Sequence, residues 1–308
     1  MGQTLKGQNF RVLRYNTAAS KFECVAMSTS CSINLTADTE EASTKDILGG
    51  AKMPQVNAHS WQVSVETLDV TDIQAIIAAV KNYEKFTLLW DEVSTSDNQT
   101  PIMAGFARTG SAYLNSASFK FDNRTNSTKS LQFTGVGQLA KVTTTPAFEP
   151  ISVSTAFTKG QYVRLFLGSD ATATPAAVVA SATSLSLELS MELEDATTKD
   201  TTGDWRVQEP TGYTFTITTN SLVRSGDTIT SAVAGKTYSD LMDIYEAGNP
   251  VRFQIANVGG DNNRTKLNVL ASGLVVLTAL NSSHQNRQNS TYDATLSGYG
   301  ELETPSES

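Results

Sequence analysis

SINLTADTEEASTKD (32–46) and the following SWQVSVETL (60–68) have a counterpart in SLELSMELEDATTKD (186–200) and the following YTFTITTNSLV (213–223). In both places an alternating strand pattern runs into an acidic segment that ends in Thr-Lys-Asp, and a second alternating pattern follows. Alternation of apolar and polar residues predicts half-buried β-strands. The chain is therefore predicted to carry the same strand–arm–strand unit twice.

The repeat extends over nearly the whole chain. Six blocks recur in the same order: KGQNFRVLR (6–14) with KGQYVRLFL (159–167), TSCSINL (29–35) with TSLSLEL (183–189), EASTKD (41–46) with DATTKD (195–200), WQVSVETLDV (61–70) with FTITTNSLVR (215–224), KFTLLWDEV (85–93) with PVRFQIANV (250–258), and SLQFTGVGQL (130–139) with DATLSGYGEL (293–302). Ordered matches at nearly constant spacing indicate an internal duplication. We predict a first domain at 1–145, a linker at 146–158, a second domain at 159–303 and a flexible C-terminal tail at 304–308.

Each copy is predicted to be mainly β with one helix. Helical spacing of apolar residues marks 70–85 in the first copy, where Thr71 or Asp72 can cap the helix. The corresponding segment of the second copy is 237–250, where Ser239 can cap and a Gly and a Pro follow. The predicted fold is mainly β with a minor α component: two tandem β-sandwich or β-barrel domains, each with one flanking helix and a long inter-strand arm.

The arm is the candidate functional element. Some twenty residues separate the two strand cores around it, far more than a tight hairpin needs. A long connection that keeps its motif in both copies favours contact with another subunit. The candidate inter-subunit residues are Thr44, Lys45, Asp46, Thr198, Lys199, Asp200 and Trp205.

Composition excludes several classes of function. The formal net charge of −8 gives no basis for tight nucleic-acid binding, which needs clustered Lys and Arg. No apolar run approaches the length of a membrane span or of a signal peptide. Cys24 and Cys31 are the two cysteines, too few for a disulfide framework. We expect a protein that folds in a reducing cytoplasm.

No catalytic, metal or cofactor site is predicted. The histidines, His59 and His284, do not occupy matching places in the two copies. The fragments GVGQL and GYGEL come late in β-rich domains and do not open a helix, so a phosphate-binding loop is excluded. Asp195, Asp200 and Asp204 lack the Gly and the closing Glu of a calcium loop. We therefore expect no enzyme activity and no cofactor.

The ordered set of motifs resembles the major tail tube proteins of long-tailed bacteriophages. The resemblance rests on the strand, the acidic segment, [Ser/Thr]-Thr-Lys-Asp, the second strand with its aromatic opening, the helix, KFTLLW or PVRFQI, and the terminal GVGQL or GYGEL. It covers nearly the whole chain twice. The second copy matches more closely through TKDTTGDW (198–205), because TKDILGGAK (44–52) lacks the aromatic residue.

The resemblance implies a mechanical function. Six tube domains form a ring whose inner sheets join into a closed barrel, so a duplicated chain would make a pseudo-hexameric ring from three subunits. Stacked rings would form the tail tube of the virion, assembled in the host bacterial cytoplasm. DNA would pass through without specific binding, and the partners would be further copies, the tape measure protein, the tail terminator and the distal tail or baseplate proteins. The alternatives are the inner tube of a contractile injection or secretion system and a tandem β-sandwich binding or adhesion module.

Overall fold

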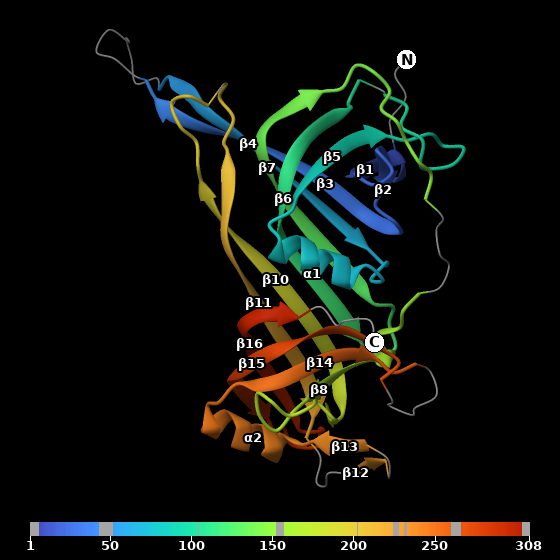
Figure 1. The fold of residues 1–308 in the computed structure, drawn as a ribbon, viewed down its shortest axis with the longest axis vertical. Coiled ribbons are helices and arrows are strands. Elements are labelled where there is room, and N and C mark those ends of the chain that lie inside the picture. Colours follow the sequence, from blue (N-terminus) through green and yellow to red (C-terminus); the bar gives the residue numbers. More distant parts are fainter. Residues whose placement is uncertain are drawn as a thin grey trace.

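The computed structural model describes residues 6–42, 52–103, 105–151, 157–201, 203–223, 228–230, 233–259 and 266–303. These residues form an elongated, mainly β molecule with two α-helices, which confirms the predicted fold class (Figure 1). The candidate arm residues Thr44, Lys45 and Asp46 lie outside the described residues.

The chain has two halves with the same order of elements. The first half comprises η1 (Gly7–Asn9), β1 (Phe10–Asn16), β2 (Lys21–Cys24), β3 (Ser28–Glu41), β4 (Pro54–Thr67), α1 (Ile73–Lys81), β5 (Lys85–Glu92), β6 (Arg108–Asp122) and β7 (Thr128–Lys141). The second half comprises η2 (Gly160–Tyr162), β8 (Val163–Leu167), β9 (Ala177–Val179), β10 (Ala182–Asp195), β11 (Gln208–Leu222), β12 (Thr228–Thr230), β13 (Val233–Lys236), α2 (Tyr238–Ala247), β14 (Val251–Asn257), β15 (Asn268–Ser283) and β16 (Thr291–Glu303). The second half adds the short hairpin β12–β13.

Strand pairing repeats between the halves as well. In the first half the strands follow the order β2-β1-β5-β6-β7-β4-β3, and in the second half β9-β8-β14-β15-β16-β11-β10. All these neighbours are antiparallel. The order therefore assigns each strand of the first half a counterpart in the second.

The correspondence holds residue by residue. The β3–β4 hairpin has register shifts between Ser28 and Ser30 and between Asp38 and Thr39. The β10–β11 hairpin has its shifts at the same places, with Ala182 corresponding to Ser28 and every position displaced by 154 residues. The β6–β7 and β15–β16 pairings correspond in the same way at a displacement of 163 residues, with Ser282 corresponding to Phe119. We call residues related by these displacements pseudo-equivalent.

Apolar side chains fill the space between the sheets and the helices, and two aromatic residues illustrate how. Trp61, which alternates with the buried Val63 and Val65 along β4, is fully buried. A Cβ added to Gly135 would come within 2.1 Å of its indole ring. In the second half the pseudo-equivalent pair is Phe215 and Gly298, where the closest approach would be 2.4 Å. Each ring therefore requires a glycine on the neighbouring strand.

The N-cap of α2 differs from the sequence prediction, whereas the N-cap of α1 is one of the two residues predicted. In α2 the N-cap is Thr237 and not Ser239, because Thr237 and Asp240 bond reciprocally in a capping box. In α1 the N-cap is Asp72, but its carboxylate makes no capping bond and instead pairs with Lys129. The predicted end of α2 is confirmed, since Gly248 adopts the left-handed conformation there.

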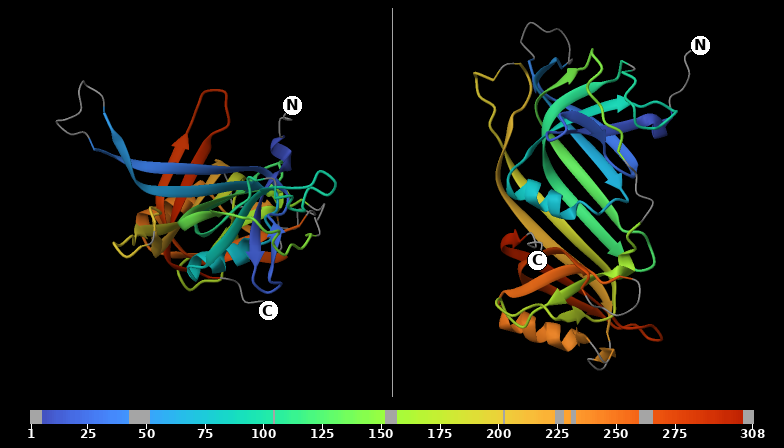
Figure 2. Two further views of the ribbon diagram at one scale, coloured as in Figure 1. Left: turned by 90° about the horizontal axis from the view of Figure 1, so that it is seen from above. Right: turned by 45° about the vertical axis from the view of Figure 1, so that its right-hand side comes forward.

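The long loop predicted around the Thr-Lys-Asp motifs is shorter than expected. Strands β3 and β4 continue through residues 38–41 and 54–59, and β10 and β11 are extended in the same way. In both arms the described strands therefore continue as antiparallel hairpins. Figure 2 shows the β3–β4 hairpin and the β15–β16 hairpin leaving the molecule in different directions.

Candidate assembly surfaces

The two halves are joined by a strand junction between β6 and β10. Strand β6 pairs with β5 over residues 108–113 and, along the same edge, with β10 over residues 116–122. The junction is antiparallel and places Leu187 opposite Phe119 and Leu189 opposite Ala117. All four side chains are buried. One continuous sheet therefore crosses from the first half into the second.

Strand β3 is pseudo-equivalent to β10. The edge of β3 that corresponds to the β6-paired edge of β10 is open. Within the described part of the chain, β3 pairs with β4 alone. Leu35 is 65% exposed, whereas its pseudo-equivalent Leu189 at the internal junction is 1% exposed. An open strand edge with an exposed apolar residue is a template for pairing with another chain.

Strand β15 offers the complementary edge. It pairs with β14 up to Val275, and its other edge pairs with β16. Beyond Val275, the described strands supply no partner for the β14 edge, although the pseudo-equivalent stretch of β6 binds β10. The described strands thus form one internal junction between the halves. Strands β3 and β15 each have an unpaired stretch of edge that is pseudo-equivalent to one side of that junction.

The second arm lies against the first half. Backbone bonds connect His59 to both Asp204 and Arg206, at 2.5 Å and 2.9 Å, and Trp205 packs on the His59 ring with centroids 5.2 Å apart. The guanidinium group of Arg206 pairs with Asp38 at 2.7 Å and with Asp195 at 3.1 Å. Figure 1 shows the two hairpin arms side by side at this place.

The remaining arm candidates occupy the exposed turn of the second hairpin. Thr198, Lys199 and Asp200 are exposed. The Thr198 amide donates to the Thr201 hydroxyl at 2.9 Å, and the Asp200 amide donates to the Thr198 hydroxyl. Thr198 therefore shapes the turn, and Lys199 projects from it into solvent. Of the four described arm candidates, Trp205 is the one that the structure brings into contact with the other half.

Hydrogen bonds from Thr197 favour the ionised form of Asp195, which lies where the second arm leaves the body. The pKa of Asp195 lies below its usual range, first because of hydrogen bonds from the Thr197 side chain and backbone, and further because of the nearby Arg206 charge. Asp195 belongs to the acidic segment that precedes Thr-Lys-Asp in the sequence, whereas no sequence motif points to Arg206.

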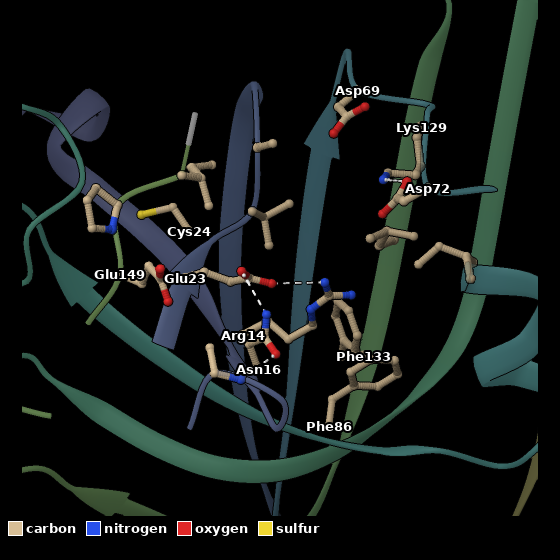
Figure 3. Close-up of a pocket in the computed structure, with 17 residues that line it drawn as sticks. Arg14, Asn16, Glu23, Cys24, Asp69, Asp72, Phe86, Lys129, Phe133 and Glu149 are labelled. Atoms are coloured by element: carbon tan, nitrogen blue, oxygen red, sulfur yellow. Dashed lines mark hydrogen bonds and ion pairs between the residues drawn. The ribbon is translucent and has the colours of Figure 1, made fainter. Parts of the chain in front are cut away.

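The first half also contains a polar cavity of about 560 Å³. Figure 3 shows an ion pair between Lys129 and Asp72 on one side and one between Arg14 and Glu23 on the other. These four charged groups are therefore paired with one another. In the second half the pseudo-equivalent of Lys129 is Tyr292, which is fully buried and donates to the Ala180 carbonyl. We assign no ligand to the cavity.

The described residues contain no other feature of a chemical site. No three or more His, Cys, Asp or Glu side chains among them are grouped closely enough to hold a metal ion. A search of the same residues for helices long and apolar enough to span a membrane found none. Both cysteines are free thiols, and burial raises the pKa of Cys24 to about 11, which suppresses its reactivity.

Comparison with known proteins connects this fold to a class of virion proteins. A family model described as "Phage tail tube protein" matches residues 162–304, the second half of the chain. A chain from a "Virion of native gene transfer agent (GTA) particle" is 16% identical, with 47% of this chain and 96% of that chain covered and a TM-score of 0.34. A chain from a "Tail of empty GTA particle computed with helical refinement, C6 symmetry" is 15% identical, with 47% and 95% covered and a TM-score of 0.34. No curated protein matches the chain.

The family match confirms that the chain resembles phage tail tube proteins. It supports a structural role in a phage tail tube, and hence in a virion. The repeated Thr-Lys-Asp motif of the arms is part of the sequence pattern that indicates this class of protein. The open edges and their apolar residues, such as Leu35, had no distinct sequence signal, because a strand at an open edge has the same alternation as a strand at a closed one.

Proposed function

We propose that three copies of this chain close into a ring by strand addition, with β3 of one copy pairing with β15 of the next. Stacked rings of this kind would form a tail tube in which each ring contains six similar domains. The observation that carries the proposal is the internal β6–β10 junction, since the open edges of β3 and β15 are pseudo-equivalent to its two sides.

The internal junction supplies a register for the proposed one. Glu188 lies opposite Ser118. Their pseudo-equivalents are Asn34 on β3 and Asn281 on β15, so these two side chains would lie opposite each other across the interface. Leu35 would likewise lie opposite Leu280. The contact is head to tail, and such contacts generate a closed ring when the rotation between copies completes a circle.

Three copies follow from the duplication. A single chain supplies two of the domains, joined to each other by the same geometry that would join it to its neighbour. Closure would pair the open edges of β3 and β15, which removes the tendency of these open strands to aggregate. In this proposal the tube would enclose DNA and a tape measure protein without specific binding, and would meet terminator and distal tail proteins at its ends. Assembly would take place in the host bacterial cytoplasm, and the subunit would have no catalytic role.

Cysteine cross-linking tests the register and the ring size together. In a Cys31→Ser background, Asn34→Cys with Asn281→Cys should form disulfides between chains on mild oxidation, because paired strand positions fall within disulfide range. Cys24 can stay, since its thiol is buried and its pKa is raised to about 11. Asn34→Cys with Gln285→Cys is the matched control, four residues and about 13 Å out of register.

Non-reducing electrophoresis then gives the answer. The in-register pair should give covalent dimers and trimers, with the trimer as the largest product, and the control should give none. A ladder that continues past three chains would overturn the ring of three. If the control cross-links as well as the test pair, the register is wrong, and if neither cross-links in assembled protein, the junction is wrong.

A further inference from the structure

Resting on the proposed ring, we infer a second contact between neighbouring copies: the exposed face of α2 docks on the first half of the next chain. The face is formed by Met242 and Tyr245. It is distinct from the strand edges, because it lies on the helix and involves side chains instead of backbone groups.

The pseudo-equivalent helix of the first half, α1, shows how such a helix packs when a neighbouring half is present. Helix α1 packs on its own β6 and also on β10, β15 and β16 of the second half. The Gln74 side-chain amide donates to the Val269 carbonyl at 2.8 Å, and Lys81 pairs with Glu301 at 3.3 Å. Gln74, Ile77 and Lys81 follow one another along one face of the helix. Helix α1 therefore helps to fasten the two halves together.

Helix α2 has the same position in the second half but lacks that neighbour. Tyr83 after α1 and Gly248 after α2 both have positive φ, and Phe86 and Val251 pair with pseudo-equivalent residues of β6 and β15. These matches displace α2 from α1 by 165 residues. Helix α2 packs on β15 and β13, both in its own half.

Exposure differs between the helices at two apolar positions. Ile77 and Val80 are 1% and 2% exposed, whereas their pseudo-equivalents Met242 and Tyr245 are 41% and 50% exposed. Ile76 and its pseudo-equivalent Leu241, which face the helix's own half, are both buried. The change from a buried to an exposed side chain thus occurs at Met242 and Tyr245, whereas Tyr238 and Ile244, whose pseudo-equivalents are also buried, stay half-buried.

The displacement of 163 residues between β6–β7 and β15–β16 identifies the surface that would cover the exposed face of α2. Val269 and Glu301, which α1 contacts, have Phe106 and Gln138 as pseudo-equivalents in the first half. Phe106 is an exposed aromatic residue at the start of that surface. The partner is therefore the first half of a second copy in the same ring, and the contact would cover Met242, Tyr245 and Phe106 together.

The first experiment tests the helix face. Met242→Lys combined with Tyr245→Lys should raise the concentration needed for ring formation roughly tenfold or more, because two apolar contacts are replaced by charges in a desolvated interface. Ala247→Lys is the matched control: it places a lysine on the same helix at an exposed position whose pseudo-equivalent, Asn82, is also exposed. Ring formation is measured by sedimentation velocity, and unfolding of the free chain by urea titration.

The second experiment introduces a charge pair at the proposed contact. Lys81 and Glu301 have Glu246 and Gln138 as pseudo-equivalents, so Gln138→Lys should create an ion pair with Glu246 of the neighbour. Ring formation should tighten about two- to fivefold at low salt, as expected for an exposed ion pair. The gain should vanish when Glu246→Ala is added.

These outcomes separate the two proposals. If wild-type protein forms rings and the α2 double variant assembles equally well, the helix contact is overturned and the ring stands. The helix contact is also overturned if the double variant destabilises the free chain, or if Ala247→Lys blocks assembly as strongly. If wild-type protein gives no three-chain ring under conditions that yield tubes, the proposed function itself fails.

Discussion

Leu35 and Leu189 allow the proposed strand junction to be tested with one substitution at two pseudo-equivalent positions. Leu189 is 1% exposed in the internal junction, and Leu35 is 65% exposed at the open edge. Complete burial of a leucine side chain is worth about 1.5–3 kcal/mol. Burial of the part of Leu35 that is still exposed would therefore stabilise each junction by about 1–2 kcal/mol.

The effect multiplies around a ring. Three junctions would lose about 3–6 kcal/mol in total with Leu35→Ala. Because three chains associate, the chain concentration at half-assembly varies as the inverse square root of the association constant, which gives an increase of roughly 10- to 150-fold. Leu189→Ala should instead lower the free energy of unfolding of the single chain by about 2–5 kcal/mol, because it leaves a cavity in a closed core.

Two measurements distinguish these results. Sedimentation velocity over a concentration series gives the assembly midpoint, and urea unfolding at a concentration where the protein is monomeric gives the stability. We expect Leu35→Ala to raise only the assembly midpoint and Leu189→Ala to lower the free energy of unfolding of the monomer. If Leu35→Ala assembles at the wild-type concentration, β3 does not bury its apolar face in a junction. Destabilisation of the monomer by Leu35→Ala as large as that by Leu189→Ala would refute the reasoning from pseudo-equivalence.

Three further predictions concern the arms and the core. Lys45→Glu combined with Lys199→Glu should block tube growth, seen by negative-stain electron microscopy, and leave the subunit folded; tubes of normal length would contradict the arm assignment. Arg206→Ala should release the second arm from the first half and increase amide hydrogen exchange at that arm, because the residue joins two carboxylates, and unchanged exchange would show that the ion pairs do not hold it. Gly135→Ala should lower the free energy of unfolding by about 1–3 kcal/mol, because its methyl group would overlap the Trp61 ring, and unchanged stability in a urea titration would contradict that packing.

The sequence predicted the fold class and the repeat because both are encoded in local patterns. Alternation identified the strands, and helical spacing identified two helices of which both exist. The cap of α2 was misassigned because Ser239 and Thr237 are both good caps by type, and the choice depends on the position of Asp240, three residues after Thr237. Local chemistry of this kind is predictable once the helix start is known to within one residue.

The candidate surfaces were harder to predict, because exposure depends on what lies next to a strand. Leu35 and Leu189 have nearly the same sequence neighbours, SINLTA and SLELSM, and yet one is exposed and the other buried. Only the three-dimensional arrangement shows that β10 has strands on both edges, whereas β3 pairs with β4 on one edge and with none of the described strands on the other. The arm motif, by contrast, was visible in the sequence because it occurs twice.

The internal junction and the proposed junction between chains differ in their side chains, and the difference follows from when each junction would form. At the internal junction, β6 presents Phe119 and Phe121, both buried. The pseudo-equivalents are Ser282 on β15 and His284 immediately after it, both exposed. An internal junction closes as the chain folds, so its aromatic residues never face water in the finished subunit. A junction between chains has to remain soluble until assembly, and large exposed apolar patches at a strand edge favour aggregation.

The polar side chains on β15 therefore fit an edge that waits for a partner. Apolar contact would be reduced to Leu35 and Leu280 at the strand edge, with Met242 and Tyr245 adding to it from the helix. Ser282→Phe, which restores the aromatic residue of the internal junction, should thus strengthen assembly while it lowers the solubility of the free chain. Static light scattering of dilute protein would detect both effects, and a variant that stays soluble with unchanged assembly would contradict this explanation of the polar edge.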